Sequence, residues 1–298
     1  MNSRAKMPTL WRVTILEVIQ RSADFLAKKG VESPRLQVEL MLAHALKMPR
    51  MKLYLSFERV LTETELAALR TMVQRRGNRE PLQYILGSVN FCGLELMVDR
   101  RVLIPRPETE LLAERAWNYV LQSAISNPQS AIVLDLCTGS GCLAIAIAAK
   151  APHSQVHASD ISADALVVAR ENAGRHQVQE RIQFYQGDCF AALPKDLRFD
   201  LIVSNPPYIA TAEVATLEPE LRDHEPKNAL DGGADGLDFY RRIAGEAKSF
   251  LADKGKLMLE LGDGQAAAVG EIFREQKWIV ETVEADYSRL PRILVASI

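Results

Sequence analysis

The sequence predicts an α/β protein: a doubly wound parallel sheet of seven strands, preceded by a small helical domain and a β-hairpin linker. From about residue 131, short apolar runs of strand length alternate with helical segments, which is typical of a parallel sheet with crossover helices. Residues 1–88 show helical periodicity and helix caps instead. A length of 298 residues suits one large and one small domain. We therefore expect a helical domain at 1–88, the linker at 89–108 and the sheet domain at 109–298.

Helical signals run through the first domain. Residues 9–29 are amphipathic, and Gly30 stops the pattern. Ser33-Pro34 predicts a second helix, with a cap residue followed by proline at the first helical position. Residues 62–65 read Thr-Glu-Thr-Glu, a capping box, and Gly77 ends the helix that follows. The domain holds no catalytic cluster, so we expect it to recognise a partner.

In the linker, the spacing of the apolar residues changes from a helical to a strand-like period. Residues 94–98 alternate between apolar and polar or variable positions, residues 99–101 read Asp-Arg-Arg, and residues 102–104 are apolar again. This pattern predicts a β-hairpin that turns at 99–101. Residues 105–110 read Pro-Arg-Pro-Glu-Thr-Glu. The prolines predict a stiff, extended segment, and the acids suit the first turn of a helix.

The sheet domain contains seven runs that predict strands. They lie at residues 131–134, 156–159, 182–185, 201–204, 257–261, 278–282 and 292–296. Helices are expected at 142–150, 163–172 and 239–251, with crossovers between all the strands. Residues 209–238 are acidic and have no clear period. A long irregular segment inside a domain is often a functional lid, so we expect this one to cover the ligand crevice.

Composition and charge limit the possible classes of protein. No apolar run approaches the roughly 20 residues of a membrane helix, and the N-terminal residues lack a signal-peptide core. The 4 cysteines show no C-x-x-C spacing, which argues against disulfides or a metal site and favours the cytoplasm. Residues 1–110 carry 18 Lys and Arg against 12 Asp and Glu, and the remainder carries 18 against 26. So modest an excess favours a solvated helical surface over a nucleic-acid interface.

The first strand leads into a loop suited to a nucleoside cofactor. Asp135 precedes residues 137–141, Cys-Thr-Gly-Ser-Gly, whose glycines let the backbone approach a ligand at a helix N-terminus. Asp160 follows the second strand, 21 residues after Gly139, where an acid can accept bonds from both ribose hydroxyls. Asp188 follows the third strand, where it could accept a bond from an adenine amino group.

An NAD enzyme is an alternative, because residues 139–144 also fit the dinucleotide pattern G-x-G-x-x-G/A. The acids argue against it. At the end of the first strand, Asp135 would point at the crevice, repel a pyrophosphate and attract a cationic sulfonium cofactor that carries an ammonium group.

The fourth strand ends at Asn205-Pro206-Pro207-Tyr208, since prolines cannot extend a central strand. In an open α/β sheet, the carboxyl end of a strand faces the ligand crevice. There the Asn205 side chain and the Pro206 carbonyl can accept N–H bonds from a planar amide or amine, and the Tyr208 ring can cover its face. Taken alone, the four residues could equally be a proline-rich strand end with a core tyrosine.

Together, Asp135, Gly139-x-Gly141, Asp160, Asp188 and the Asn-Pro-Pro-Tyr motif resemble a class I S-adenosylmethionine-dependent methyltransferase. This form of the motif resembles the one in enzymes that methylate planar amide or exocyclic amino nitrogens. Four further segments are similar to the release factor glutamine methyltransferase family, at residues 81–87, 102–110, 229–238 and 291–292. The resemblance covers nearly the whole chain from residue 8.

The resemblance implies S-adenosyl-L-methionine as cofactor and, as substrate, the glutamine of the GGQ motif in class I peptide chain release factors, methylated on its amide nitrogen. It implies no metal, no membrane contact, no nucleic-acid substrate and a monomer. The implied catalytic residues are Asn205, Pro206 and Tyr208. The implied cofactor-binding residues are Asp135, Cys137, Thr138, Gly139, Ser140, Gly141, Asp160, Asp188, Cys189 and Asn205. The implied substrate-binding residues are Asn205, Pro206, Pro207, Tyr208, Arg106 and Thr109.

Several alternatives share these features. In the ribosomal-protein glutamine methyltransferases, the linker sequence resembles V-P-R-S-P. Residues 104–109 here read Ile-Pro-Arg-Pro-Glu-Thr instead. Cys137 and Cys189 also depart from the family pattern, where glycine and an aromatic are common, and this bears on the shape of the methionine and adenine subsites. A nucleic-acid adenine N6-methyltransferase could use the same motif, but the net charge of −2 and the lack of a basic stripe argue against it. The intact motif at Asn205 argues against a binding module without catalysis.

Overall fold

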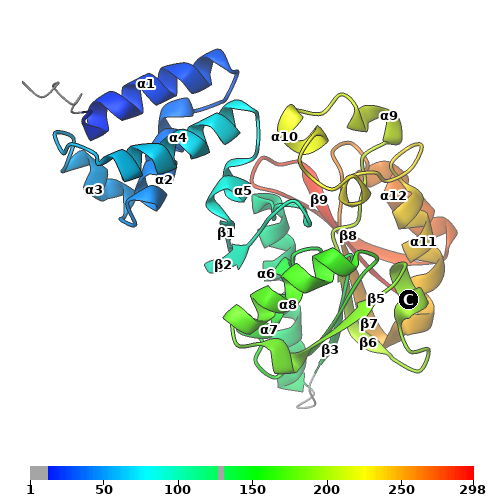
Figure 1. Ribbon diagram of the computed structural model, residues 1–298. Helices are drawn as coiled ribbons and strands as arrows, with labels where there is room; N and C mark the ends of the chain where they lie inside the picture. Colours follow the sequence, from blue (N-terminus) through cyan, green and yellow to red (C-terminus); the bar gives the residue numbers. More distant parts are fainter. Residues whose placement is uncertain (1–12, 127–130) are drawn as a thin grey trace, which may run out of the picture. The chain divides into compact units, whose positions relative to one another are not determined.

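The computed structural model describes residues 13–126 and 131–298, so residues 9–12 of the first expected helix and the N-terminal residues lie outside the described part. The chain divides into two compact units, Met1–Leu86 and Gly87–Ile298 (Figure 1). The hairpin that we expected in a separate linker belongs to the second unit.

The first unit is a bundle of short helices around one apolar core. It contains α1 (Ile15–Lys28), α2 (Pro34–Ala45), α3 (Arg50–Tyr54), α4 (Glu63–Gly77) and α5 (Leu82–Leu86). Helix α1 begins at Ile15, because Thr14 caps it in a reciprocal capping box with Glu17. The capping box and the helix end expected for α4 are confirmed. Helix α2 does begin at Pro34, but the Ser33 side chain makes no capping hydrogen bond, contrary to our expectation.

The second unit is built on the seven expected strands. They are β3 (Ile132–Leu136), β4 (Gln155–Asp160), β5 (Ile182–Gln186), β6 (Phe199–Ser204), β7 (Leu251–Glu260), β8 (Ile279–Ala285) and β9 (Pro291–Ser297), in the spatial order β5-β4-β3-β6-β7-β9-β8. The expectation of an entirely parallel sheet was wrong at one edge, where β9 runs antiparallel between β7 and β8. The chain returns from β8 into β9 through a short turn in which the Asp286 carboxylate accepts the Ser288 and Leu290 N–H groups. A tight turn reverses the direction of a strand, whereas parallel strands need a long crossover.

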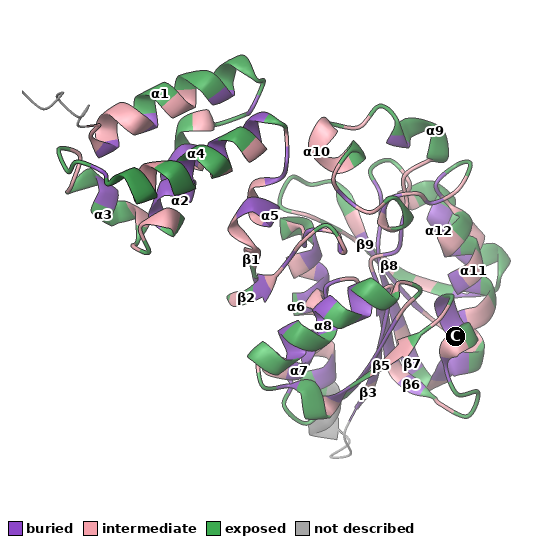
Figure 2. Ribbon diagram, viewed as in Figure 1, coloured by how far each residue is buried: buried purple, intermediate pink, exposed green. Residues whose placement is uncertain are grey.

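Helices cover both faces of this sheet (Figure 1). They are α6 (Pro107–Ser126), α7 (Cys142–Lys150), α8 (Ala163–Arg175), α11 (Asp238–Glu246) and α12 (Ala266–Glu275). Strand β6 shows the two layers: Leu201 and Val203 join the core under α6 and α7, whereas Ile202 joins the core under α11 and α12. Such alternation within a continuously apolar strand places the sheet in the centre of the unit, and the central strands β3 and β6 are accordingly buried (Figure 2).

The hairpin consists of β1 (Ser88–Phe91) and β2 (Leu94–Met97). It turns at Cys92 and Gly93, not at 99–101 as the sequence predicted. Both turn residues have positive φ, 52° and 80°, which is the geometry of a two-residue hairpin turn. Residues 102–104 form no strand.

The segment at residues 209–238 carries more local structure than its sequence suggested. It contains the short helices α9 (Thr211–Val214) and α10 (Pro219–Arg222), and Ile209 pairs with Asp231 in a single bridge. Gly232 packs against the backbone of the residues just before this segment: a Cβ there would lie 2.7 Å from the Tyr208 Cα atom and 2.8 Å from the Pro207 oxygen. Among the described residues, no helix is long and apolar enough to cross a bilayer.

A buried asparagine fastens the hairpin to the sheet domain. Asn172, on α8, is fully buried. Its Oδ1 accepts from the Met97 N–H at 2.7 Å, and its Nδ2 donates to the Met97 and Ser140 carbonyls, both at 3.0 Å. One side chain therefore joins strand β2, helix α8 and the glycine-rich loop after β3.

We expect Asn172→Ala to lower the free energy of unfolding by about 2–4 kcal/mol, because it leaves three backbone groups without a partner and each buried one costs about 1–3 kcal/mol. Urea unfolding followed by circular dichroism would measure the loss. Asn90→Ala, at an exposed position of the same hairpin, is the matched control and should change the free energy by less than about 0.5 kcal/mol. Equal effects of the two substitutions would show that Asn172 is no anchor.

Candidate active site

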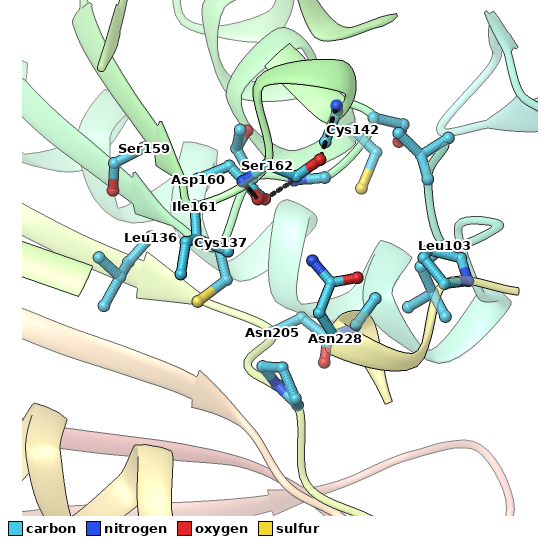
Figure 3. A pocket seen from close by; sticks show the side chains of 18 of the residues that line it. Leu103, Leu136, Cys137, Cys142, Ser159, Asp160, Ile161, Ser162, Asn205 and Asn228 are labelled. Atoms are coloured by element: carbon cyan, nitrogen blue, oxygen red, sulfur yellow. Dashed lines mark hydrogen bonds between the residues drawn. The ribbon is translucent and has the colours of Figure 1, made fainter. Parts of the chain in front are cut away.

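A cavity of about 340 Å³ lies at the carboxyl ends of the central strands (Figure 3). The strand order reverses between β3 and β6, and open α/β sheets bind ligands at such a switch point. The volume is within the range of about 300–1,000 Å³ that is usual for small-molecule sites. The lining combines the loops that follow β3, β4, β5 and β6 with residues 101–109 and with part of the segment at 209–238.

The glycine-rich loop forms one wall of the cavity. Residues 137–141 all contribute to the lining except Gly141, which begins α7 with φ of 81° and packs against α8: a Cβ there would lie 3.1 Å from that of Ala169. Gly139 also has positive φ, 55°, but a Cβ there would meet no protein atom within 4 Å. The side of Gly139 that lacks a side chain is therefore open to a ligand.

Asp135 lies behind this loop. Its side chain is fully buried and does not line the cavity. Oδ2 accepts the Thr138 hydroxyl at 2.6 Å and the Ala144 N–H at 3.0 Å, whereas Oδ1 has no protein partner. Burial raises the pKa of Asp135 to about 7. The sequence had placed this carboxylate facing the crevice, but the structure shows it holding the loop from beneath.

Asp160 stands at the end of β4, on the cavity wall. Its oxygens accept the Gly139 N–H and the Ser162 N–H, both at 2.9 Å, and burial raises its pKa. The Ile161 N–H also donates to this carboxylate, and because its two oxygens can accept about four hydrogen bonds together, one position remains available for a ligand. Figure 3 shows Asp160, Ile161 and Ser162 together on this wall.

The loop after β5 contributes Asp188 and Cys189 to the lining. The Asp188 carboxylate is exposed and already forms an ion pair with Arg242 at 2.9 Å, a partner that the sequence did not suggest. Cys189 lies beside Cys137, and a hydrogen bond between the two thiols, together with burial, raises the pKa of Cys137. Cys137 is therefore a neutral thiol at physiological pH, suited to an apolar part of a ligand.

Asn205 lies at the cavity and is held from two sides. The preceding residue, Ser204, donates its hydroxyl to the Leu136 carbonyl at 2.6 Å, which locks the end of β6 to the end of β3. The Asn205 Nδ2 donates to the Thr109 hydroxyl oxygen at 3.1 Å. Within the described chain, Asn205 Oδ1 and the Pro206 carbonyl accept no hydrogen bond. Two free acceptors thus adjoin each other at the strand end.

Besides Asp135 and Gly141, three more of the expected site residues do not line the cavity, namely Pro206, Tyr208 and Arg106. Pro206 is buried, whereas Pro207 does contribute to the lining. Tyr208 packs against the core under α11 and α12, and burial raises its pKa to about 12. Arg106 forms an ion pair with the buried Glu225 at 2.6 Å, which ties the segment before α6 to the expected lid.

Glu260, which the sequence analysis missed, lies behind Thr109. It ends β7, is 1% exposed, and its Oε2 has no protein partner. A hydrogen bond from the Thr109 side chain and the nearby Arg292 lower its pKa, but burial outweighs them and raises it to about 7. The sequence analysis also assigned no role to several lining residues, namely Val102, Leu103, Ile161, Ser162, Asn228 and Phe239.

Two family comparisons match different parts of the chain. Residues 17–87 match the PrmC N-terminal domain, and residues 118–220 match the methyltransferase small domain. The release factor glutamine methyltransferase of Geobacter sulfurreducens is 48% identical over 266 residues, which cover 89% of each chain. The chain belongs to the release factor glutamine methyltransferase family. The enzyme of the same name from Chlorobaculum tepidum is 43% identical over 94% of this chain and 95% of its own.

Solved structures support the fold. The catalytic domain of hMettl16 in complex with a MAT2A 3′UTR hairpin has a TM-score of 0.53 at 17% identity, over 80% of this chain and 84% of that one. A methyltransferase from Pyrococcus furiosus has a TM-score of 0.50 at 18% identity, over 69% and 89%. Together with the family membership, these comparisons confirm the expected class I methyltransferase fold and the expected enzyme class.

The raised pKa of Asp135 predicts a pH effect on stability. The folded protein holds the proton up to about pH 7, whereas the ordinary value in an unfolded chain is 3.8, so folding is favoured at low pH and this contribution is lost as the pH rises to about 7. We expect Asp135→Asn to flatten the decline in unfolding free energy between pH 5 and about 7, by up to about 1.4 kcal/mol per pH unit. Unfolding in urea at several pH values measures the slope. The exposed Asp263→Asn serves as control, and an unchanged slope in Asp135→Asn would refute the assignment.

Proposed function

We propose that this enzyme transfers a methyl group from S-adenosyl-L-methionine to the side-chain amide nitrogen of the glutamine in the GGQ motif of class I peptide chain release factors. The observation that carries the proposal is a pair of free acceptors in adjacent residues, Asn205 Oδ1 and the Pro206 carbonyl, of which Asn205 lines a nucleoside-sized cavity. A primary amide has two N–H donors, which these acceptors match. The printed names of the relatives support the same substrate.

The residues around the cavity fit the proposed cofactor. The remaining acceptor position of Asp160 suits a ribose hydroxyl, and the open side of Gly139 lets a ligand approach the backbone of the loop. Cys137 and Cys189 offer apolar contact. Asp188 can accept from an adenine amino group with the oxygen that Arg242 does not engage. Above about pH 7, where Asp135 is ionised, its unpaired Oδ1 adds negative potential beneath a cationic ligand.

The chain's residues act on the amide mainly by position. When bound, S-adenosyl-L-methionine supplies a methyl group on a cationic sulfur. The glutamine nitrogen is a weak nucleophile, because its lone pair is delocalised into the carbonyl. Asn205 Oδ1 and the Pro206 carbonyl would accept its two N–H bonds, aim the nitrogen and stabilise the positive charge that develops on it. Tyr208, two residues after Pro206, is proposed to cover the face of the substrate amide. After methyl transfer, the proton of the product leaves to water or to a carbonyl.

The first unit is proposed to recognise the release factor, since it carries no chemistry-bearing cluster. Arg106 remains a proposed substrate contact, although its ion pair with Glu225 would have to rearrange for direct binding. A release factor substrate implies action in the cytoplasm, and we propose that the enzyme acts there as a monomer.

Mass spectrometry of purified proteins tests the substrate. The enzyme and S-adenosyl-L-methionine are incubated with a release factor, with the same factor carrying Gln→Ala in its GGQ motif, with ribosomal proteins, or with adenine-containing RNA. We expect one methyl group on the GGQ glutamine and none on the variant. Methylation of a ribosomal protein or of RNA in its place would overturn the proposal.

Asp160 should govern cofactor affinity. We expect Asp160→Ala to weaken S-adenosyl-L-methionine binding by about 1.5–3 kcal/mol, the range for a hydrogen bond to a charged group. Isothermal calorimetry measures the change. Asp164→Ala removes an exposed carboxylate just after the same loop and controls for the loss of charge alone. Equal affinities in wild type and Asp160→Ala, or tight binding of NAD, would contradict the assignment.

Asn205 should govern turnover. We expect Asn205→Ala to lower the single-turnover rate roughly 10²–10³-fold, by analogy with the loss of one preorganised oxyanion-hole donor, while cofactor affinity changes little. Asn205→Asp keeps an acceptor and adds negative charge, so it should bind the cationic cofactor more tightly and still turn over more slowly, because it cannot donate to Thr109. Rapid-quench methylation of a release factor, with calorimetry in parallel, measures both quantities. Wild-type turnover in Asn205→Ala would reduce Asn205 to a strand-end cap.

A further inference from the structure

The site contains a buried carboxylate that the proposed chemistry does not use. Glu260 is 1% exposed and lies outside the cavity lining. An unpaired buried carboxylate is expensive, and replacement of such groups by apolar residues is often neutral or stabilising. Glu260 adjoins Thr109, which is also 1% exposed and is the side chain that contacts Asn205. The three residues come from the end of β7, the first turn of α6 and the end of β6.

The direction of each hydrogen bond among these three side chains follows from which groups can donate and which can accept. Above about pH 7, where Glu260 is ionised, its carboxylate can only accept, so the Thr109 hydroxyl donates its single proton to Glu260. The Thr109 oxygen is then an acceptor toward Asn205, and only the amide nitrogen of Asn205 can donate to it, at 3.1 Å. The other end of the amide, Oδ1, is thereby turned away from Thr109.

We infer that Glu260 and Thr109 are positioning residues, which fix the Asn205 amide with Oδ1 directed toward the substrate nitrogen. This inference rests on the proposed function of Asn205 and assigns Thr109 a role other than the direct substrate contact expected from the sequence. An asparagine amide is nearly symmetrical in shape, so packing alone does not choose between its two orientations. The flipped orientation would present NH₂ to the substrate NH₂, where no hydrogen bond can form.

A threonine-to-valine substitution tests the relay with almost no change in shape. Thr109→Val removes the hydroxyl, and we expect the single-turnover methylation rate to fall roughly tenfold to hundredfold through misorientation of Asn205, with cofactor affinity within about twofold. Thr109→Ser restores the hydroxyl and should recover most of the rate. Glu260→Gln can offer NH₂ to Thr109 and should slow the reaction as well. Ser154→Ala, which removes a buried hydroxyl between α7 and β4, is the matched control.

Non-additivity separates positioning from general damage. If Thr109 acts only through Asn205, adding Thr109→Val to Asn205→Ala should lower the rate no further, because residues that act as a unit are grossly non-additive. Full additivity of the two losses would overturn the inference, as would a wild-type rate in Thr109→Val.

A measurement on the free enzyme keeps the inference separate from the proposed function. With ¹⁵N-labelled asparagine, the Asn205 side-chain amide signal is identified by its loss in Asn205→Ala. We expect its protons to exchange with water more slowly in wild type and in Ser154→Ala than in Thr109→Val. Identical exchange and shifts in all three would overturn the relay. If wild type methylates no release factor, the proposed function fails, and the spectra still decide whether Thr109 and Glu260 orient Asn205.

Discussion

The parallel pairing of β3 with β6 is the constraint on which the site depends. Leu136 pairs with Ser204, and the Ser204 hydroxyl bonds the Leu136 carbonyl, so the two strands end at the same level. The glycine-rich loop and Asn205 then leave the sheet side by side, although 68 residues separate their strands along the chain. The strand order reverses at this pair, so neither loop is covered by a crossover helix. A cofactor wall and a substrate acceptor can therefore share one cavity.

Two buried acidic side chains, Asp135 and Glu260, lie near this junction and contact different parts of the site. Asp135 holds the loop through Thr138 and Ala144, and Glu260 faces Thr109. Burial raises the pKa of both to about 7, so the unliganded protein keeps two carboxyl groups in surroundings that disfavour their charge. Such groups lower stability, and a cationic ligand offsets that loss. The arrangement fits a site that is preorganised for positive charge rather than one designed for maximal stability.

Much of the fold followed from local patterns, because strands buried on both faces are continuous apolar runs and helix caps have specific residues. The failures involve long-range choices. The hairpin turn lies at Cys92-Gly93, and only the glycine hinted at it. Strand β9 is antiparallel to β7 and β8 because Asp286 closes a tight turn, which periodicity cannot reveal. Asn205 and Asp160 were found through motifs. Glu260 and Asn172 were missed, because a polar residue within a strand or helix pattern reveals its partner only when distant elements pack.

Rigidity on every side of Asn205 explains how a site without an evident general base can act on an amide. Two prolines stiffen the backbone that follows it. Gln265 donates to the Tyr208 carbonyl at 2.8 Å, and Gly232 lets the next segment close on the same stretch of backbone. A neutral amide gives an enzyme no charge to hold, so orientation must come from the directions of hydrogen-bond acceptors. An acceptor is useful for this only if it cannot turn. The close contacts of residues 204–208 fix the backbone on either side of Asn205. The hydrogen bond to Thr109 fixes the orientation of the Asn205 side-chain amide.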